Sequence, residues 1–483
     1  MSSVYDKYQL VVGLEVHAQL STKSKAYCGD ATDFGRPSNT QTSAITLGHP
    51  GTLPMSNKKV IEYAIKMGLA CGSTIRERNE YARKNYFYPD LPKGYQITQD
   101  KTPICNGGEI LVKDHQGKTK TIGITRIHME EDAGKSIHDL DPFNSLVDLN
   151  RAGVALIEIV SEPDIRSSDE AYQYLSEVRK LVRYLDICDG NLEEGSLRCD
   201  ANISVMLKGS TEFGNRTEVK NMNSLRNVKR AIEFEMKRQI DLIESGGQVE
   251  QQTRTFNAAN GSTSVMRTKE DANDYRYFPE PDLQPVLVSK KYVEEIHKSL
   301  PPLPKELYHK FTTKFGLSDY DAGVLIEDKD TALYYNEICN HTTNFKTAAN
   351  IVSGSVKSYL NENAIEIDSL AIPPSKIAEL IKLIDENKVS NTVATQKIFK
   401  KMINSKSSPE EIAIQNNWIQ ESDSDSIQEF IQQALEKYPD KVLEYKNGKK
   451  GLIGLFMGEV MKLSKGKADP KIANKLIQQS LEK

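Results

Sequence analysis

Acidic and imidazole side chains interrupt four otherwise apolar segments in the first 205 residues. These segments are residues 14–17 (Leu-Glu-Val-His), 127–132 (Ile-His-Met-Glu-Glu-Asp), 156–160 (Leu-Ile-Glu-Ile-Val) and 193–202. A carboxylate buried in a sheet destabilises the fold unless a cation or hydrogen-bond donors compensate its charge. Because the four segments are far apart in the chain, together they predict a site for a hard cation such as Mg²⁺.

The predicted cation would bind five side chains if their strands are neighbours. They are Glu15, His17, Glu130, Glu158 and Asp200. Mg²⁺ usually keeps waters or phosphate oxygens in its shell, and it neutralises charge on a phosphoryl group that is being transferred. The alternative is that each acid pairs with a nearby base, such as Arg126, Arg151 or Arg198. We favour the metal site, because carboxylates with a shared function cluster.

Strand-like alternation predicts how these side chains are oriented. Every even position in residues 9–20 is apolar, so Glu15 and His17 share the other face of the strand. A second segment repeats the pattern, with Asp200 and Asn202 on one face and apolar residues on the other. Both segments are therefore expected to be strands with one apolar face and one face equipped for chemistry.

The surrounding elements predict an α+β fold with a largely antiparallel sheet. Helical periodicity runs over 171–185, where Ser167 and Glu170 suggest a capping box, and over 224–244. These helices do not alternate regularly with the strands, which argues against a doubly wound sheet. A proline-rich connector at 300–304 then marks a change to helical patterns.

Three domains are expected from these changes in pattern. Residues 1–292 would form the domain that carries the acidic segments, 293–405 a helical domain, and 406–483 a small helical tail domain. From Lys441 to Lys483 ten lysines face four acids, whereas the whole chain has a net charge of −4. A basic tail on an acidic body can bind a polyanion away from a metal site, although a solvated helix surface has the same composition.

Bulk composition favours a cytoplasmic protein. Charged residues make up 27% of the chain and hydrophobic ones 38%, and no apolar run approaches the roughly 20 residues that span a bilayer. The first expected strand begins at Tyr8, which leaves no room for a signal peptide before it. The six cysteines are scattered without a Cys-x-x-Cys pair, so the sequence does not indicate a zinc knuckle. Scattered thiols are typical of a reducing compartment.

Other nucleotide-binding motifs are absent or ambiguous. Gly134-Lys135-Ser136 resembles the end of a P-loop, but Met129 stands at the first glycine position and acids precede the loop. Residues 83–93 and 274–282 are rich in tyrosine, lysine, arginine and proline. Each is expected to be a structured loop that either stacks on a nucleotide or packs on the surface.

Six motifs together resemble the B-subunit family of the tRNA-dependent amidotransferases, and the resemblance covers essentially the whole chain. The motifs are Val12-Gly13-Leu14-Glu15-Val16-His17, Arg83-Lys84-Asn85-Tyr86-Phe87-Tyr88-Pro89-Asp90, His128-Met129-Glu130-Glu131-Asp132-Ala133-Gly134-Lys135, Val147-Asp148-Leu149-Asn150-Arg151, Leu156-Ile157-Glu158-Ile159-Val160-Ser161-Glu162-Pro163-Asp164 and Glu194-Gly195-Ser196-Leu197-Arg198-Cys199-Asp200-Ala201-Asn202. The family converts glutamyl-tRNA(Gln) to glutaminyl-tRNA(Gln) and, in many organisms, aspartyl-tRNA(Asn) to asparaginyl-tRNA(Asn).

The resemblance implies a fold and partners. The first domain would be an antiparallel-sheet cradle related to glutamine synthetase, followed by two all-helical domains, the last of which contacts tRNA. An amidase-type A subunit would release ammonia from glutamine and deliver it through an internal channel. A small C subunit would complete the heterotrimer.

The resemblance also implies the chemistry and its residues. The γ-phosphoryl group of ATP would be transferred to the side-chain carboxylate of the charged tRNA, because a carboxylate is unreactive toward ammonia and an acyl phosphate is not. Glu15, His17, Glu130 and Glu158 would position the metal or phosphates, with Glu131, Glu193, Asp200 and Asn202 in the same pocket. Lys84 and Arg198 are expected to contact phosphate.

One position departs from the family pattern, and two other functions compete with the amidotransferase. Some relatives carry a zinc site after the first strand, but Asp30 follows Cys28-Gly29 here, so no structural zinc is expected. A non-catalytic tRNA-binding factor would gain nothing from acidic strand faces. A ligase that uses free ammonia on a small metabolite would not need the lysine-rich tail.

Overall fold

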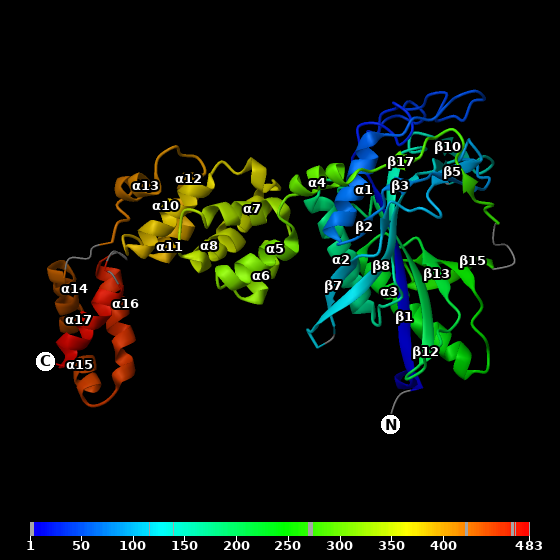
Figure 1. The fold of residues 1–483 in the computed structure, drawn as a ribbon. Helices are drawn as coiled ribbons and strands as arrows, with labels where there is room; N and C mark the ends of the chain where they lie inside the picture. The colour runs from blue at the N-terminus through cyan, green and yellow to red at the C-terminus, as the bar shows by residue number, and fades with distance from the viewer. Residues whose placement is uncertain are drawn as a thin grey trace. The chain divides into compact units, whose positions relative to one another are not determined.

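The chain forms two compact units, Met1–Leu303 and Pro304–Lys483 (Figure 1). The computed structural model describes residues 4–114, 116–138, 140–268, 274–420, 424–464, 468 and 470–482. The first unit is built on a large sheet and the second on helices, so the predicted α+β class is confirmed. The finer predicted boundaries at 292/293 and 405/406 stay predictions.

A ten-stranded sheet forms the centre of the first unit. Its order is β15-β14-β13-β12-β1-β11-β8-β6-β2, and β7 also pairs with β8. The strand bounds are β1 (Tyr8–Gln19), β2 (Thr74–Ile75), β6 (Cys105–Asn106), β7 (Glu109–Lys113), β8 (Thr119–Glu131), β11 (Ala155–Ser161), β12 (Leu197–Leu207), β13 (Thr217–Lys220), β14 (Gln252–Asn257) and β15 (Ser262–Thr268). Neighbours are antiparallel except β13 and β14, which run parallel. β1, β11, β8 and β12 therefore bring all the acidic segments together.

Three helices cover one face of this sheet: α1 (Lys58–Ala70), α2 (Ser168–Tyr184) and α3 (Leu225–Glu244) (Figure 1). The apolar alternation of β1 points into this layer, where Val12 and Leu14 are fully buried. At the start of α2 the side chain of Ser167 accepts a hydrogen bond from the backbone N–H of Glu170, as the predicted cap requires. Since these helices bury the apolar side chains of β1, the remaining side chains of the strand lie on the opposite face.

Three smaller sheets complete the first unit. β4 (Ala82–Asn85) pairs with β5 (Tyr95–Thr98) and β16 (Phe278–Pro279), β9 (Lys135–Ile137) with β10 (Leu146–Asp148), and β3 (Arg78–Asn79) with β17 (Val286–Leu287). β5 also contacts the end of β8, and this contact brings polar side chains of the small sheet to the acids of the large one. Helix α4 (Lys290–Lys298) packs on α1 and belongs to the same core.

The second unit contains the remaining helices. They are α5 (Pro304–His309), α6 (Asp319–Leu325), α7 (Lys329–Ile338), α8 (Phe345–Ile351), α9 (Lys357–Asn363), α10 (Pro374–Asp385), α11 (Asn391–Val393), α12 (Phe399–Met402), α13 (Pro409–Gln415), α14 (Ser424–Lys437), α15 (Pro439–Lys446), α16 (Ile453–Leu463) and α17 (Pro470–Glu482). The last four share an apolar core around Phe456 and Ile477. Part of the lysine-rich segment (Lys465, Lys467, Asp469 and Lys483) lies outside the described residues. No helix in the described parts of the chain has the length and apolar character that crossing a membrane requires.

Candidate metal and phosphate site

The register of three strands brings the candidate residues onto one face of the sheet. β1 runs between β11 and β12, so His17 lies opposite Glu158 on one side and Arg198 on the other. Two residues along β1, Glu15 lies opposite Asp200. Because side chains repeat every second residue in a strand, these groups share the face that the helices leave uncovered.

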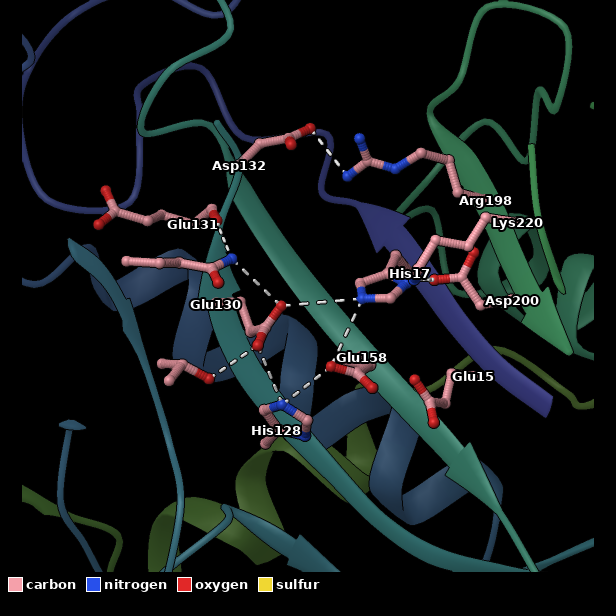
Figure 2. Close-up of polar contacts among 12 residues, drawn as sticks. Glu15, His17, His128, Glu130, Glu131, Asp132, Glu158, Arg198, Asp200 and Lys220 are labelled. Carbon is pink, nitrogen blue, oxygen red and sulfur yellow. Dashed lines mark hydrogen bonds and ion pairs between the residues drawn. The ribbon is translucent and has the colours of Figure 1, made fainter. Parts of the chain in front are cut away.

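His17, Glu130 and Glu158 form the first cluster (Figure 2). One ligand atom from each lies within 4.8 Å of the others. Nε2 of His17 is 3.4 Å from a carboxylate oxygen of Glu158 and 3.9 Å from one of Glu130. Two carboxylates and an imidazole, largely withdrawn from solvent, are a donor set that suits a hard divalent cation.

His128 lies on the inner side of this cluster. Its Nε2 is 3.2 Å from a carboxylate oxygen of Glu130 and 3.2 Å from one of Glu158 (Figure 2). The ring is 2% exposed, and its Nδ1 has no hydrogen-bond partner. His128 was not among the predicted site residues, although its position two residues before Glu130 on the same strand was a usable signal.

Positive neighbours keep the carboxylates of the first cluster ionised. Burial and the charge of Glu158 would raise the pKa of Glu130, but the hydrogen bond and charge of His128, with the ammonium of Lys84, lower that pKa to about 2. Burial would likewise raise the pKa of Glu158, and the two histidines, His17 first, hold it well below its usual value. The pKa of His128, which burial would lower, is raised to about 9 by the same carboxylates. The carboxylates are therefore anionic, and a cation that binds them would displace protons from the histidines.

β5 fixes the orientation of Glu130 from the other side. The hydroxyl of Thr98 donates a hydrogen bond of 2.8 Å to one carboxylate oxygen, and the side-chain amide of Gln96 donates one of 3.4 Å to the other. The same amide donates to the backbone carbonyl of Glu131 at 2.7 Å. These donors limit the rotation of a ligand carboxylate, which is what a preorganised metal site requires.

Glu15, Asp200 and Glu218 form a second cluster beside the first. The amide of Asn202 donates a hydrogen bond of 2.7 Å to Glu15, while the ammonium of Lys220 pairs with Asp200 and lies 2.8 Å from Glu218. Burial, followed by the charges of Glu158 and Glu218, raises the pKa of Glu15. Glu218 and Lys220 were not among the predicted residues, although they alternate on β13 as ligands on one face would.

The structure separates the other candidate residues from these clusters. Glu131 points away from Glu130, pairs with Lys93 and accepts a 2.8 Å hydrogen bond from the backbone N–H of Ile97 (Figure 2). It lines a small cavity behind β8 together with Lys93 and Tyr27. Glu193 is exposed in the loop before β12.

The two candidate phosphate contacts have different surroundings. Lys84 stands on β4 with its ammonium 4.9 Å from the ring centroid of Tyr275. Burial would lower its pKa, but the charges of Glu130 and Glu158 and the nearby tyrosines raise it above the usual value. Arg198 makes a 3.0 Å ion pair with Asp132.

Arginine pairing does not account for the acidic face. Among the described residues, the arginine pairs near the site are those of Arg198 and Arg151, and both contact Asp132 at 3.0 and 3.6 Å. Glu130 and Glu158 instead contact histidines, which can share a metal ion with them. Arginine therefore does not neutralise the first cluster, whereas Lys220 pairs with Asp200 in the second.

Fold and site define an α+β protein whose large sheet carries clustered carboxylates and histidines on one face and helices on the other. Comparison with known proteins agrees with this class. Residues 10–294 match the family model described as the GatB/GatE catalytic domain, and residues 333–481 match the model described as the GatB domain. The chain belongs to the GatB family.

Relatives match this chain over nearly its whole length. The B subunit of the aspartyl/glutamyl-tRNA(Asn/Gln) amidotransferase from Alkalilimnicola ehrlichii is 48% identical over 477 residues, which cover 99% of this chain and all of the relative. The protein of the same name from Caldicellulosiruptor saccharolyticus is 48% identical over 480 residues, with 99% and 100% coverage. The one from Geobacter sulfurreducens is 49% identical over 478 residues, with 98% and 99% coverage.

Proposed function

We propose that the chain is the component of a tRNA amidotransferase that activates the side-chain carboxylate of glutamyl-tRNA(Gln), aspartyl-tRNA(Asn) or both, and then amidates it. The names of the full-length relatives support the substrate and the enzyme class. The observation that carries the proposal is the cluster of His17, Glu130 and Glu158 on the open sheet face. Clustered acids contribute little to the stability of a fold, whereas such clusters are common where a protein does chemistry on phosphates.

The reaction needs two steps because a carboxylate is a resonance-stabilised anion with a poor leaving group. In the first step, a carboxylate oxygen attacks the γ-phosphorus of ATP, the bond to the bridging oxygen breaks, and ADP leaves. In the second step, ammonia attacks the carbonyl carbon of the acyl phosphate, inorganic phosphate leaves, and a proton is lost. The product is glutaminyl- or asparaginyl-tRNA.

The acidic clusters would serve the first step. Glu130, Glu158 and His17 would hold Mg²⁺, with Glu15 and Asp200 at a neighbouring position. When bound, the ion would screen the charges of the ATP phosphates from the incoming carboxylate. His128, Gln96 and Thr98 would keep the ligand carboxylates oriented.

Basic and amide side chains would contact the phosphates and complete the site. Lys84 is a candidate for contact with the transferred phosphoryl group, because the charges of Glu130 and Glu158 raise its pKa despite its burial and keep it cationic. Arg198 would contact a phosphate while it keeps its ion pair with Asp132. Asn202 would orient the carboxylate of Glu15 through its hydrogen bond. Glu131 and Glu193 would act outside the metal shell, since the first pairs with Lys93 and the second is exposed.

The proposed reaction also requires partners. Ammonia would come from an amidase-type A subunit, with a small C subunit completing a heterotrimer, and the substrate tRNA would bind the helical unit. A reaction on charged tRNA places the protein in the compartment of translation, which we take to be the cytoplasm.

Substitution of Glu158 by Gln tests the proposal in the assembled heterotrimer. The variant keeps the size of the side chain but removes a ligand charge, so ATP-dependent amide formation should fall at least about 100-fold, as expected for a residue that acts in phosphoryl transfer. Filter binding of charged tRNA should be unchanged. Glu212→Gln, on the exposed loop after β12, is the matched control. Wild-type turnover by the Glu158 variant would refute the proposal.

A further inference from the structure

Four tyrosine rings form a continuous chain beside the first acidic cluster. Tyr88 packs against Tyr86, Tyr86 against Tyr275, and Tyr275 against Tyr277, each pair edge to face with centroids 6.0 Å apart. The rings come from two segments far apart in the sequence. We refer to these four residues as the tyrosine chain.

Backbone contacts fix the tyrosine chain in place. β16 pairs with β4, which joins the segment of Phe278 to that of Arg83. The backbone N–H of Asn85 donates to the carbonyl of Tyr275 at 3.0 Å, and its side-chain amide donates to the carbonyl of Arg276 at 2.9 Å. The rings are thus a rigid surface rather than loose loop side chains.

The tyrosine chain is exposed at both ends and adjoins the reaction site in the middle. Tyr88 is 58% and Tyr277 43% exposed. The ammonium of Lys84 lies over the ring of Tyr275, and Gln96, which pairs with Lys84 between β4 and β5, donates a hydrogen bond to Glu130. A ligand that stacks on the exposed rings would therefore have its neighbouring group close to Lys84 and the acids.

Arg276 adds a cation to this surface. Its side chain is 82% exposed and is paired only loosely with Asp274, at 3.8 Å, so it remains accessible to an anion. Its φ of 45° lies in the left-handed region, which is unfavourable for a residue with a side chain. Exposed aromatic rings with an accessible arginine are the groups that bind unpaired nucleotides through stacking and phosphate contact.

We propose that the tyrosine chain and Arg276 bind the unpaired 3′ end of the substrate tRNA. This inference rests on the proposed function, in which the reacting carboxylate is esterified to that 3′ end. To reach acids on the face of a sheet, the unpaired nucleotides must unstack from the end of the tRNA duplex, and their bases then need new stacking partners. Tyr88 and Tyr277 would supply them, and Arg276 would contact the backbone phosphate.

A binding experiment with two RNAs and the assembled heterotrimer tests this inference. The RNAs are the uncharged substrate tRNA and the same tRNA without its unpaired 3′ nucleotides. The wild type should bind the truncated RNA about tenfold more weakly, as the loss of stacked bases predicts. Tyr277→Ala should bind the complete RNA more weakly than the wild type and should distinguish the two RNAs less, since Tyr88 and Arg276 remain. Tyr277→Phe, which keeps the ring, should behave like the wild type.

Controls separate this role from others. Tyr172→Ala removes a tyrosine of equal exposure (42%) from α2 and should change neither affinity. Arg276→Ala should weaken binding of the complete RNA and reduce its dependence on salt. If Tyr277→Ala still distinguishes the two RNAs as the wild type does, or raises the KM for ATP instead, the inference is wrong and the second result assigns the rings to the adenine of ATP. If the wild type forms no amide on charged tRNA, the proposed function itself fails.

Discussion

Single side chains decide whether the acidic face can hold a cation. Nε2 of His128 lies 3.2 Å from both Glu130 and Glu158, so one donor holds two ligand carboxylates at a fixed separation. A residue that orients ligands without binding the metal typically contributes roughly 10- to 100-fold to metal affinity. We therefore predict that His128→Asn weakens Mn²⁺ binding about tenfold, measured by electron paramagnetic resonance of free Mn²⁺.

The control for His128 is His49→Asn on an exposed loop, which should bind Mn²⁺ like the wild type. Circular dichroism should show that both variants retain the fold. Equal Mn²⁺ affinity in the His128 variant and the wild type would mean that the carboxylates do not depend on this imidazole.

Lys220 competes with metal at the second cluster. Its ammonium pairs with Asp200 and lies 2.8 Å from Glu218, where a divalent cation would otherwise sit. Lys220→Met removes the ammonium from between these half-buried acids, so they should take up a cation from solution. We predict more Mn²⁺ bound per chain in this variant than in the wild type at equal free concentration, with Lys208→Met, at the exposed position after β12, unchanged. Unchanged occupancy would show that the second cluster is a structural ion-pair network.

Residue types in the sequence predicted the two clusters and their surroundings only in part. Glu15, His17, Glu130 and Glu158 could be found because each stands as a polar residue in an apolar strand. Their neighbours could not be assigned, because whether Glu130 or Glu131 faces the site depends on the twist and pairing of β8. Lys93 approaches Glu131 from a loop, and no local pattern announces such a contact.

At the scale of elements, the register between strands determines which side chains of the sequence meet in the site. β1 is held on one side by its pairing with β12 and on the other by β11. The hydroxyl of Ser161 accepts a 2.8 Å hydrogen bond from the buried backbone N–H of Leu14, at the point where the pairing of β11 with β8 shifts register. Ser161 thus fixes the strand next to Glu15.

Removal of this hydroxyl should destabilise the first unit. Ser161→Ala leaves a buried N–H of Leu14 without an acceptor, which costs about 1–3 kcal/mol of unfolding free energy. Urea denaturation followed by circular dichroism measures the change. Ser161→Thr retains the hydroxyl and should recover most of the loss, whereas equal stability of the alanine variant would argue for a water that replaces the serine.

The elements were predictable to the extent that their signals are local. The helices that begin after Ser167 and Ser224 have side-chain caps and apolar faces that can be read directly. The order of strands in the sheet, and the parallel pair of β13 and β14, could not be predicted, since they result from contacts between segments far apart in the chain.

At the scale of the molecule, one cysteine thiol, that of Cys28, is partly exposed and the other five are buried. Burial raises the pKa of Cys71 and of Cys188 to about 12, so these thiols stay protonated in mildly alkaline buffer and unreactive, because the thiolate is the nucleophile. Burial also raises the pKa of Cys28, so we predict that a native thiol titration with a coloured disulfide reagent modifies this one group before the others, and all six in denaturant. Rapid modification of several groups in the native protein would contradict the burial.

The division into two compact units predicts that cation binding and tRNA binding can be separated. Both acidic clusters and the whole of their supporting core, including Leu300 and Leu303, belong to the first unit. The lysine-rich segment belongs to the second, and exposed lysines bind the phosphates of a nucleic acid in a salt-dependent manner. Residues 1–303 alone should therefore unfold cooperatively and bind Mn²⁺ with the affinity of the full chain, but bind tRNA at least about tenfold more weakly.

A charge-reversed full chain distinguishes loss of charge from loss of a domain. Lys446 and Lys475 are exposed on α15 and α17, and their replacement by Glu reverses charge without disturbing the core of these helices. The double variant should lose tRNA affinity, and the logarithm of its binding constant should depend less steeply on the logarithm of salt concentration, because fewer counterions are released. Mn²⁺ binding should stay unchanged, since no residue of either acidic cluster is altered. A wild-type salt dependence would instead assign tRNA binding to the first unit, where the tyrosine chain and Arg276 would then have to supply it.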